Sequence, residues 1–216
     1  MNMERQDKKV FLATTANEEF WDTSKPIVFL GVWCLRYSRK SFWEALQPTI
    51  ITSPLSIPNK AEEAYAYVNR VYEYLLPRLG EVLNRIHNQK HSQRYWRIVF
   101  GNWLFGYISI IYDRYLLIRL AIERYPGLST ILLAQDSFVT TRDTADFMNR
   151  VLDDAYNLQI FTRIIDKLLP NDFTRINFRI EAVSVRDYFL RKAKKLVKTL
   201  LKKNFTRLGR KGAQII

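Results

Sequence analysis

The fold is decided by a short apolar run near the start of the chain, Lys9-Val10-Phe11-Leu12-Ala13-Thr14. Two later runs have the same character: Pro26-Ile27-Val28-Phe29-Leu30-Gly31 and Ser129-Thr130-Ile131-Leu132-Leu133-Ala134. Each run is continuously apolar instead of alternating, which is typical of strands that helices cover on both faces of a parallel sheet. We therefore predict three buried parallel strands.

A long helical region separates the second run from the third, and residues 57–126 are interpreted as a helical insertion. Its first helix is predicted to be capped by Asn59 and kinked or broken by Pro77. Ser92 is predicted to cap a second helix that ends at Arg124. Because this second helix is apolar on nearly every side over its middle, we expect it to be deeply buried.

Helical patterns also occur in the last third of the chain. Thr141 is predicted to cap one helix, and a second runs over residues 157–169 until Pro170 stops it. Residues 171–185 show no regular period, and residues 186–204 form a basic amphipathic pattern. Strands that alternate with helices predict an α/β fold with a short parallel sheet and a large helical insertion.

Most of the net charge of +13 lies at the end of the chain. Residues 186–216 hold eleven Lys or Arg against the single acid Asp187, a net charge of +10 that leaves +3 for residues 1–185. The basic helix has three interpretations: a solvated connection between domains, a helix that lies on an anionic membrane surface, or a nucleic-acid tail. Few aromatic side chains accompany the basic ones, so nucleic acid is not an expected partner.

The chain shows no targeting or membrane-spanning pattern. Residues 1–9 are polar, which argues against a secretory signal peptide. The longest uncharged apolar run, residues 98–112, has 15 residues, fewer than the roughly 20 that span a bilayer. The single cysteine, Cys34, excludes a disulfide framework. We expect a cytoplasmic protein, with peripheral attachment to the inner membrane as the alternative.

The usual cofactor motifs are absent. The sequence contains no G-x-x-x-x-G-K-[ST], no G-x-G-x-x-G and no G-x-S-x-G, so NTPase, dinucleotide and serine-hydrolase functions lack support. His87 and His91 would share a face of a continuous helix and could bind a metal ion. Asn88 and Ser92 instead indicate a polar turn between them. We expect neither a metal ion nor a cofactor.

Candidate site residues follow the three predicted strands, because open parallel sheets bind ligands beyond the carboxyl ends of their strands. Carboxylates there can act as general bases toward a hydroxyl, and an aromatic ring can stack on a sugar. Each residue could instead be a simple cap or turn residue. The catalytic candidates are Asp136 and Glu18, and the substrate-binding candidates at these ends are Thr14, Thr15, Trp33 and Ser137, with Glu19, Gly31 and Arg36 beside them.

A second polar cluster lies at the start of the helix that Ser92 caps. Arg94 and Arg97 are predicted to bind an anionic substrate there, because the backbone N–H groups of a helix N-terminus also attract anions. The alternative is that they form structural ion pairs, as the Asp113-Arg114 pair further along the helix must do if it is buried.

Five stretches carry a family resemblance: residues 11–22, 27–34, 92–98, 113–115 and 136–143. Together they resemble the N-terminal part of a transferase family encoded in bacterial O-antigen and surface-polysaccharide loci. The resemblance covers nearly the whole chain. Asn102 departs from it, since the family pattern has proline there, and this affects the shape of the helix more than the chemistry.

The resemblance implies a Rossmann-like, glycosyltransferase-B-like N-terminal half. Residues 1–185 would form this domain, and residues 186–216 would hold the basic helix and the start of a missing second domain. The chain would bind a saccharide acceptor, and the missing domain an activated-sugar or similar donor. The 216 residues alone are expected to be inactive, since transfer needs both substrates aligned. The alternative function is a non-enzymatic, membrane-peripheral binding module that uses the basic helix.

Overall fold

The computed structural model describes residues 9–180, so the predicted basic helix and the predicted boundary at residue 185 lie outside the described residues. The chain divides into two compact units. The first comprises residues up to 139 together with 152–180, and residues 140–151 belong to the second. The sheet and all the strand ends discussed below lie in the first unit.

The prediction of three buried parallel strands is confirmed. They are β1 (Phe11–Ala13), β2 (Ile27–Phe29) and β4 (Ile131–Leu133). The sequence patterns missed two further strands, β3 (Thr49–Ile50) and β5 (Thr174–Ile176). β1, β2 and β3 pair in that order and β4 pairs with β5, all of them parallel.

A parallel bridge joins the two groups of strands. Phe11 of β1 pairs with Ser129, just before β4. The backbone N–H of Leu12 donates to the carbonyl of Ser129 at 2.8 Å, and the Thr130 hydroxyl donates to the carbonyl of Leu12 at 2.8 Å. The strands therefore run in the order β3-β2-β1-β4-β5, and the direction of the connections reverses between β1 and β4. In open α/β sheets, ligands bind at such a reversal.

The two missed strands lie at the ends of this order. Thr49 and Ile50 are both exposed, and Thr174 and Arg175 are exposed as well. A strand with only one neighbour and little burial does not need a continuous apolar run. The rule that detected the central strands therefore could not detect these two.

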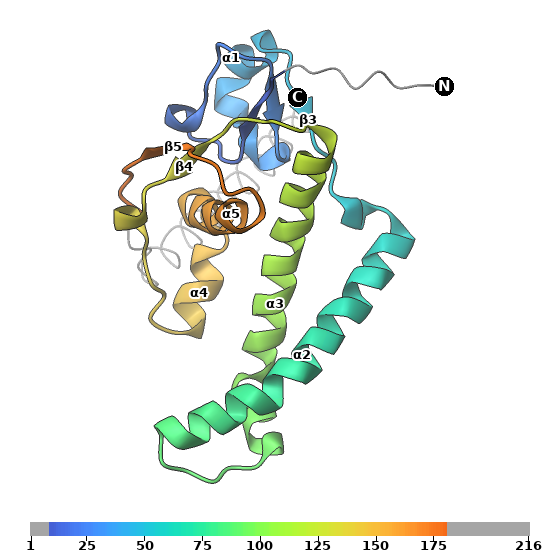
Figure 1. Cartoon of the computed structure of the whole chain (residues 1–216), viewed down its shortest axis with the longest axis vertical. Helices are drawn as coiled ribbons and strands as arrows, with labels where there is room; N and C mark the ends of the chain where they lie inside the picture. The colour runs from blue at the N-terminus through green and yellow to red at the C-terminus, as the bar shows by residue number, and fades with distance from the viewer. Residues whose placement is uncertain (1–8, 181–216) are drawn as a thin grey trace, which may run out of the picture. The chain divides into compact units, whose positions relative to one another are not determined.

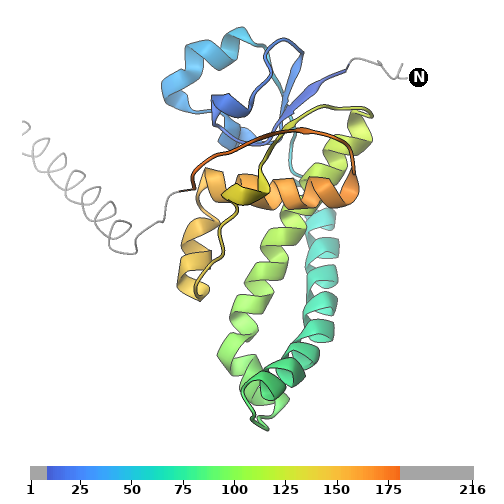
Figure 2. The same cartoon turned by 60° about the vertical axis from the view of Figure 1, so that its left-hand side comes forward.

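The helical insertion is a hairpin of α2 (Pro58–Ile86) and α3 (Gln93–Arg124), which lie side by side (Figures 1 and 2). Ser92 caps α3 as predicted, since its hydroxyl accepts from the backbone N–H of Tyr95 at 3.3 Å.

The predicted cap of α2 is wrong. Asn59 is not the cap, because the helix begins at Pro58, a first-turn position where proline loses no helical hydrogen bond. Pro77 does not break the helix, so of the two predicted effects, a kink or a break, the break is excluded. The buried side chains of Tyr72 and Leu76, and Gly80, lie on both sides of Pro77 within the face that packs on α3, and this packing supports the helix across the proline.

The expected deep burial of α3 is also wrong. Leu117, Ile118 and Ala121, near its end, join the core that lines the sheet. Near its start, by contrast, Ile98 is 72% exposed and Val99 57%. In the first half of α3, Leu104 and Ile108 pack with residues of α2 in one cluster, whereas Ile98 and Val99 lie outside that cluster.

The remaining helix of the first unit, after the short α1 (Lys40–Ala45), is α5 (Asp154–Leu168), which packs against β4 and α3. It ends before Pro170 as predicted, but it begins three residues earlier than the pattern indicated, with Asp153 as its cap. Phe161 and Ile165 of α5 pack into the same core as Leu12 and Leu132.

In the second unit the structure describes one helix, α4 (Thr144–Arg150). Thr141 was predicted to cap it, but Asp143 does so, since its carboxylate accepts from the backbone N–H of Asp146 at 2.8 Å. The buried carboxylate of Asp146 also accepts from Arg150 at 2.8 Å. Within residues 9–180, none of the helices combines the length and the apolar character that crossing a membrane requires.

Candidate functional site

Two buried threonines follow β1 at the reversal of the sheet. Thr15 donates its hydroxyl hydrogen to Oδ2 of Asp154 at 2.6 Å, and the backbone N–H of Ala16 donates to the same oxygen at 3.0 Å. The hydroxyl oxygen of Thr14 is buried and has no hydrogen-bond partner among the described residues. Because a buried hydroxyl without a partner is costly, Thr14 is a candidate contact for a bound ligand.

Asp154 contacts the candidate site residue Thr15, and the sequence reasoning missed it. Burial raises the pKa of its carboxyl, and the hydrogen bonds from Thr15 and Ala16 and the charge of Arg36 counteract this only in part. The guanidinium of Arg36 lies 3.7 Å from Oδ2 of Asp154. The signal available was the Asp153-Asp154 pair before the predicted helix, but the helix start was placed three residues too late to reveal it.

Trp33 lies beside these threonines and is 40% exposed. Its ring nitrogen donates to the backbone carbonyl of Thr14 at 3.1 Å. The ring stacks on Phe161 with centroids 6.0 Å apart and covers the Cα of Gly31 so closely that a Cβ there would overlap it. The structure thus holds the predicted aromatic residue in one orientation next to the end of β1.

Glu18 lies in the 3₁₀ turn Glu18–Phe20 that follows β1. Both oxygens of its carboxylate accept hydrogen bonds from Arg39, each at 2.7 Å. This bidentate pair holds the pKa of Glu18 below its usual value. The carboxylate is therefore charged but already occupied, which makes it a weak candidate for a general base.

Asp136 and Ser137 lie in the 3₁₀ turn Gln135–Ser137 that follows β4. They line a pocket of about 430 Å³ together with the residues after β5, including Phe178 and Arg179. The hydroxyl of Ser137 accepts from the backbone N–H of Phe178 at 2.9 Å, which closes one wall. Among the described residues, no side chain hydrogen-bonds to the exposed Asp136 carboxylate.

An aromatic contact links this pocket to the turn after β1. The rings of Phe20 and Phe178 meet edge to face, with centroids 5.8 Å apart. Phe20 also shares a buried cluster with Leu133 at the end of β4. The structure thus brings the predicted residues after β1, β2 and β4 to one edge of the sheet.

Arg94 and Arg97 are not part of this edge. They lie at the start of α3, and Ile118, which packs on the sheet, is 21 residues further along the helix, a distance of about 30 Å. Both guanidinium nitrogens of Arg97 donate to the carboxylate of Glu73, each at 2.7 Å. Of the two interpretations of Arg97, an anion-binding residue or a member of a structural ion pair, the structure therefore shows the ion pair.

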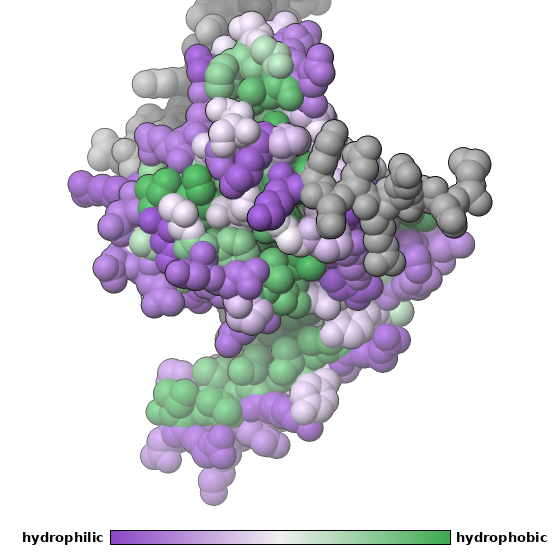
Figure 3. Space-filling model, turned by 45° about the horizontal axis from the view of Figure 1, so that its top comes forward, coloured by the Kyte–Doolittle hydropathy of each residue, from purple (hydrophilic) through white to green (hydrophobic). Residues whose placement is uncertain are grey.

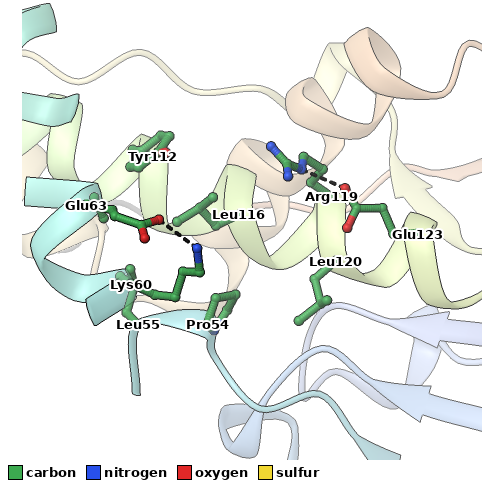
Figure 4. Close-up of a pocket in the computed structure, with 10 residues that line it drawn as sticks. Pro54, Leu55, Lys60, Glu63, Tyr112, Leu116, Arg119, Leu120 and Glu123 are labelled. Carbon is green, nitrogen blue, oxygen red and sulfur yellow. Dashed lines mark hydrogen bonds and ion pairs between the residues drawn. The ribbon is translucent and has the colours of Figure 1, made fainter. Parts of the chain in front are cut away.

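A second pocket, of about 300 Å³, lies between the turn at Pro54 and the helices α2 and α3 (Figure 4). Lys60 pairs with Glu63, and Arg119 with Glu123, each at 2.7 Å. Since each cation in its lining is paired with an anion, this pocket offers no unbalanced charge to a ligand.

The described residues contain no cluster of three or more His, Cys, Asp or Glu that could hold a metal ion. His91 lies in the loop between α2 and α3, where its ring stacks on Tyr95 with centroids 3.8 Å apart. Cys34 is buried, and its thiol donates to the carbonyl of Ala13 at 3.5 Å. Burial raises the pKa of this thiol, which disfavours the reactive thiolate.

These features define an α/β protein with a parallel sheet whose polar residues gather at the carboxyl ends of the strands. The family comparison confirms that the chain resembles a transferase family. The chain belongs to the LIC12162 family transferases, whose family model matches residues 10–214. Neither the curated proteins nor the solved structures gave a match.

Proposed function

We propose that this transferase moves a sugar or similar group from an activated donor to a hydroxyl of a saccharide acceptor, as part of bacterial surface-polysaccharide assembly. The described residues would bind the acceptor. The observation that carries the proposal is the pocket at the ends of β4 and β5, which combines the exposed carboxylate of Asp136 with the aromatic ring of Phe178. Aromatic surface and hydrogen-bonding groups together suit a sugar.

The strand order supports a Rossmann-like sheet of the glycosyltransferase-B type. The connections between the five parallel strands change direction between β1 and β4, and the candidate residues lie at the carboxyl side of that reversal. Thr14, Thr15 and Trp33 after β1 and β2 would form the second part of the acceptor surface. The cytoplasm is the proposed location, because activated sugars are made there.

Asp136 suits the role of general base better than Glu18 does, because Arg39 does not occupy it. In the proposed step, the Asp136 carboxylate takes the proton of the acceptor hydroxyl, and the hydroxyl oxygen forms a bond to the anomeric carbon of the donor. The bond from that carbon to the leaving phosphate oxygen breaks, and the phosphate departs with the electron pair. Asp136 is left protonated and returns its proton to water.

Acceptor binding can be tested without knowing the natural substrate. We would record saturation-transfer NMR spectra of the full chain with methyl glycosides of glucose, galactose, rhamnose and N-acetylglucosamine. We expect binding of at least one glycoside, and Asp136→Ala should weaken it about tenfold or more because a charge-assisted hydrogen bond is lost. Asp172→Ala, an exposed carboxylate before β5, is the matched control and should bind as the wild type does.

Binding that Asp136→Ala leaves unchanged, or no binding of any glycoside, would overturn the proposal.

A further inference from the structure

The outer end of the α2–α3 hairpin, here called the hairpin tip and comprising residues 78–99, exposes large apolar side chains. Ile86 is 69% exposed, and Ile98 and Val99 are exposed to a similar degree. Figure 3 shows hydrophobic residues gathered along the hairpin in the lower part of the view, next to hydrophilic ones. Several large apolar side chains left exposed at one end of a hairpin indicate a site of interaction.

Positive charge surrounds these apolar residues. The hairpin tip contains five Lys or Arg and one acid, Glu81, which gives a net charge of +4. Lys90 lies in the loop and Arg94 in the first turn of α3, both exposed. Arg97 is held by Glu73, whereas no ion pair within residues 9–180 neutralises Arg85, Lys90 or Arg94.

The loop of the hairpin tip is fixed in place by one side chain. The Asn84 amide oxygen accepts from the backbone N–H of His91 and from the ring nitrogen of Trp96, each at 3.0 Å. Its amide nitrogen donates to the carbonyl of His91 at 2.9 Å. Trp96 in turn packs against Gly80 of α2. These hydrogen bonds and this packing therefore hold the end of the hairpin, with its apolar and basic residues, in a fixed conformation.

We propose that the hairpin tip docks on an anionic membrane surface. Ile86, Ile98 and Val99 would enter the boundary between headgroups and acyl chains, and the basic residues would contact lipid phosphates. The argument is charge complementarity: aliphatic residues beside unpaired cations are the pattern of segments that bind anionic bilayers. This proposal is independent of the acceptor site and of the basic residues 186–204, which lie outside the described residues.

Co-sedimentation of the full chain with vesicles tests whether the hairpin tip binds an anionic membrane. Neutral phosphatidylcholine vesicles are compared with vesicles that contain roughly 30% phosphatidylglycerol, an anionic content that gives a measurable surface potential. We expect binding to the anionic vesicles only. Ile86→Ser with Val99→Ser should reduce it about tenfold, and Lys90→Gln about fivefold. Leu152→Ser, equally exposed but outside the tip, is the matched control and should bind normally.

Two further measurements examine the basic C-terminal segment and self-association. The basic segment is tested by a triple variant of the full chain, Lys194→Glu, Lys195→Glu and Lys198→Glu. The effect of the Ile86/Val99 substitutions should persist in this background, and its disappearance would overturn the proposal. Sedimentation velocity without lipid tests whether a second copy of the chain covers the tip. An oligomer that the Ile86/Val99 substitutions dissociate would also overturn it.

A fluorescent probe reports on the contact directly. The single native cysteine is buried, so Gln89→Cys in the loop of the tip can be labelled with an environment-sensitive dye. We expect its emission to shift to shorter wavelength when anionic vesicles are added, and to stay unchanged with neutral ones. Unchanged emission with anionic vesicles that do bind the protein would refute docking through the tip.

Discussion

The hydroxyl of Thr15 donates a 2.6 Å hydrogen bond to the carboxylate of Asp154, which lies 139 residues further along the chain. This bond connects the end of β1 to the first turn of α5. It therefore fixes the position of a helix N-terminus relative to the reversal of the sheet, where we place the acceptor site. Its loss should affect both stability and the geometry of that edge.

Thr15→Val removes this bond while keeping the shape of the side chain. Since the acceptor is a largely buried carboxylate, we expect the free energy of unfolding to fall by about 1–3 kcal/mol. Urea denaturation followed by circular dichroism measures the change. Thr49→Val, at an exposed position in β3, is the control, and its free energy of unfolding should stay within about 0.5 kcal/mol of the wild type. If Thr49→Val lost as much stability as Thr15→Val, the loss could not be assigned to the Thr15–Asp154 hydrogen bond.

The raised pKa of Asp154 predicts a pH dependence of a definite sign. Below the ordinary carboxyl pKa, near 4, the group is protonated in both the folded and the unfolded chain. As the pH rises through the higher pKa of the folded state, the unfolded chain releases its proton first and stability is lost.

Comparison with Asp154→Asn isolates this effect. The free energy of unfolding of the wild type, minus that of the variant, should decrease between about pH 3.5 and pH 7 when both are measured by urea denaturation. A difference that stays constant, or that grows with pH, would show that hydrogen bonds and the Arg36 charge outweigh burial at this carboxyl.

Position 31 requires glycine because the ring of Trp33, two residues further along, leaves no room for a Cβ. A Cβ at this position would overlap the ring of Trp33, so Gly31→Ala should push the ring off Phe161 and cost about 1–3 kcal/mol. In a Trp33→Ala background the same substitution should cost much less, because the ring is gone. Urea denaturation of the four proteins gives the coupling, and equal costs in both backgrounds would contradict the packing argument.

Cys34 should resist thiol reagents in the folded chain. Burial excludes the reagent and raises the thiol pKa, so little thiolate forms at neutral pH. We expect dithionitrobenzoate to label the native protein only as fast as it unfolds, and to label one thiol per chain in urea. Rapid labelling without denaturant would show that the end of β2 opens to solvent.

The sequence located the central strands because their physical requirement is local. Residues 11–13 and 27–29, with Leu132 and Leu133, are buried, and burial on both faces demands continuous apolar side chains. The cap of α3 at Ser92 is local for the same reason, as its hydroxyl reaches an N–H three residues away. By contrast, β3 and β5 owe their conformation to pairing with a neighbour, which leaves little trace in their own residues.

The outcomes at Pro77 and at the start of α3 have a related cause. Helix propensity predicts a kink or a break at Pro77, yet the helix does not break because its packing against α3 supports it across the proline. A helix that is apolar on all sides predicts burial, yet Ile98 and Val99 in the outer half of α3 stay exposed beside the face that packs on α2. In both cases the partner, and not the segment, decides the outcome.

In the candidate site, too, some features follow from the local sequence and others only from the tertiary structure. By itself, the sequence determined which residues follow the buried strands, because a buried strand ends where its apolar run ends. These residues include Thr14, Thr15, Trp33, Asp136 and Ser137. Only the tertiary structure decided that Asp154 joins Thr15, that Arg39 occupies Glu18, and that Arg97 belongs to a distant ion pair. Those outcomes depend on distances between segments that are far apart in the chain, and a periodic pattern within one segment holds no information about them.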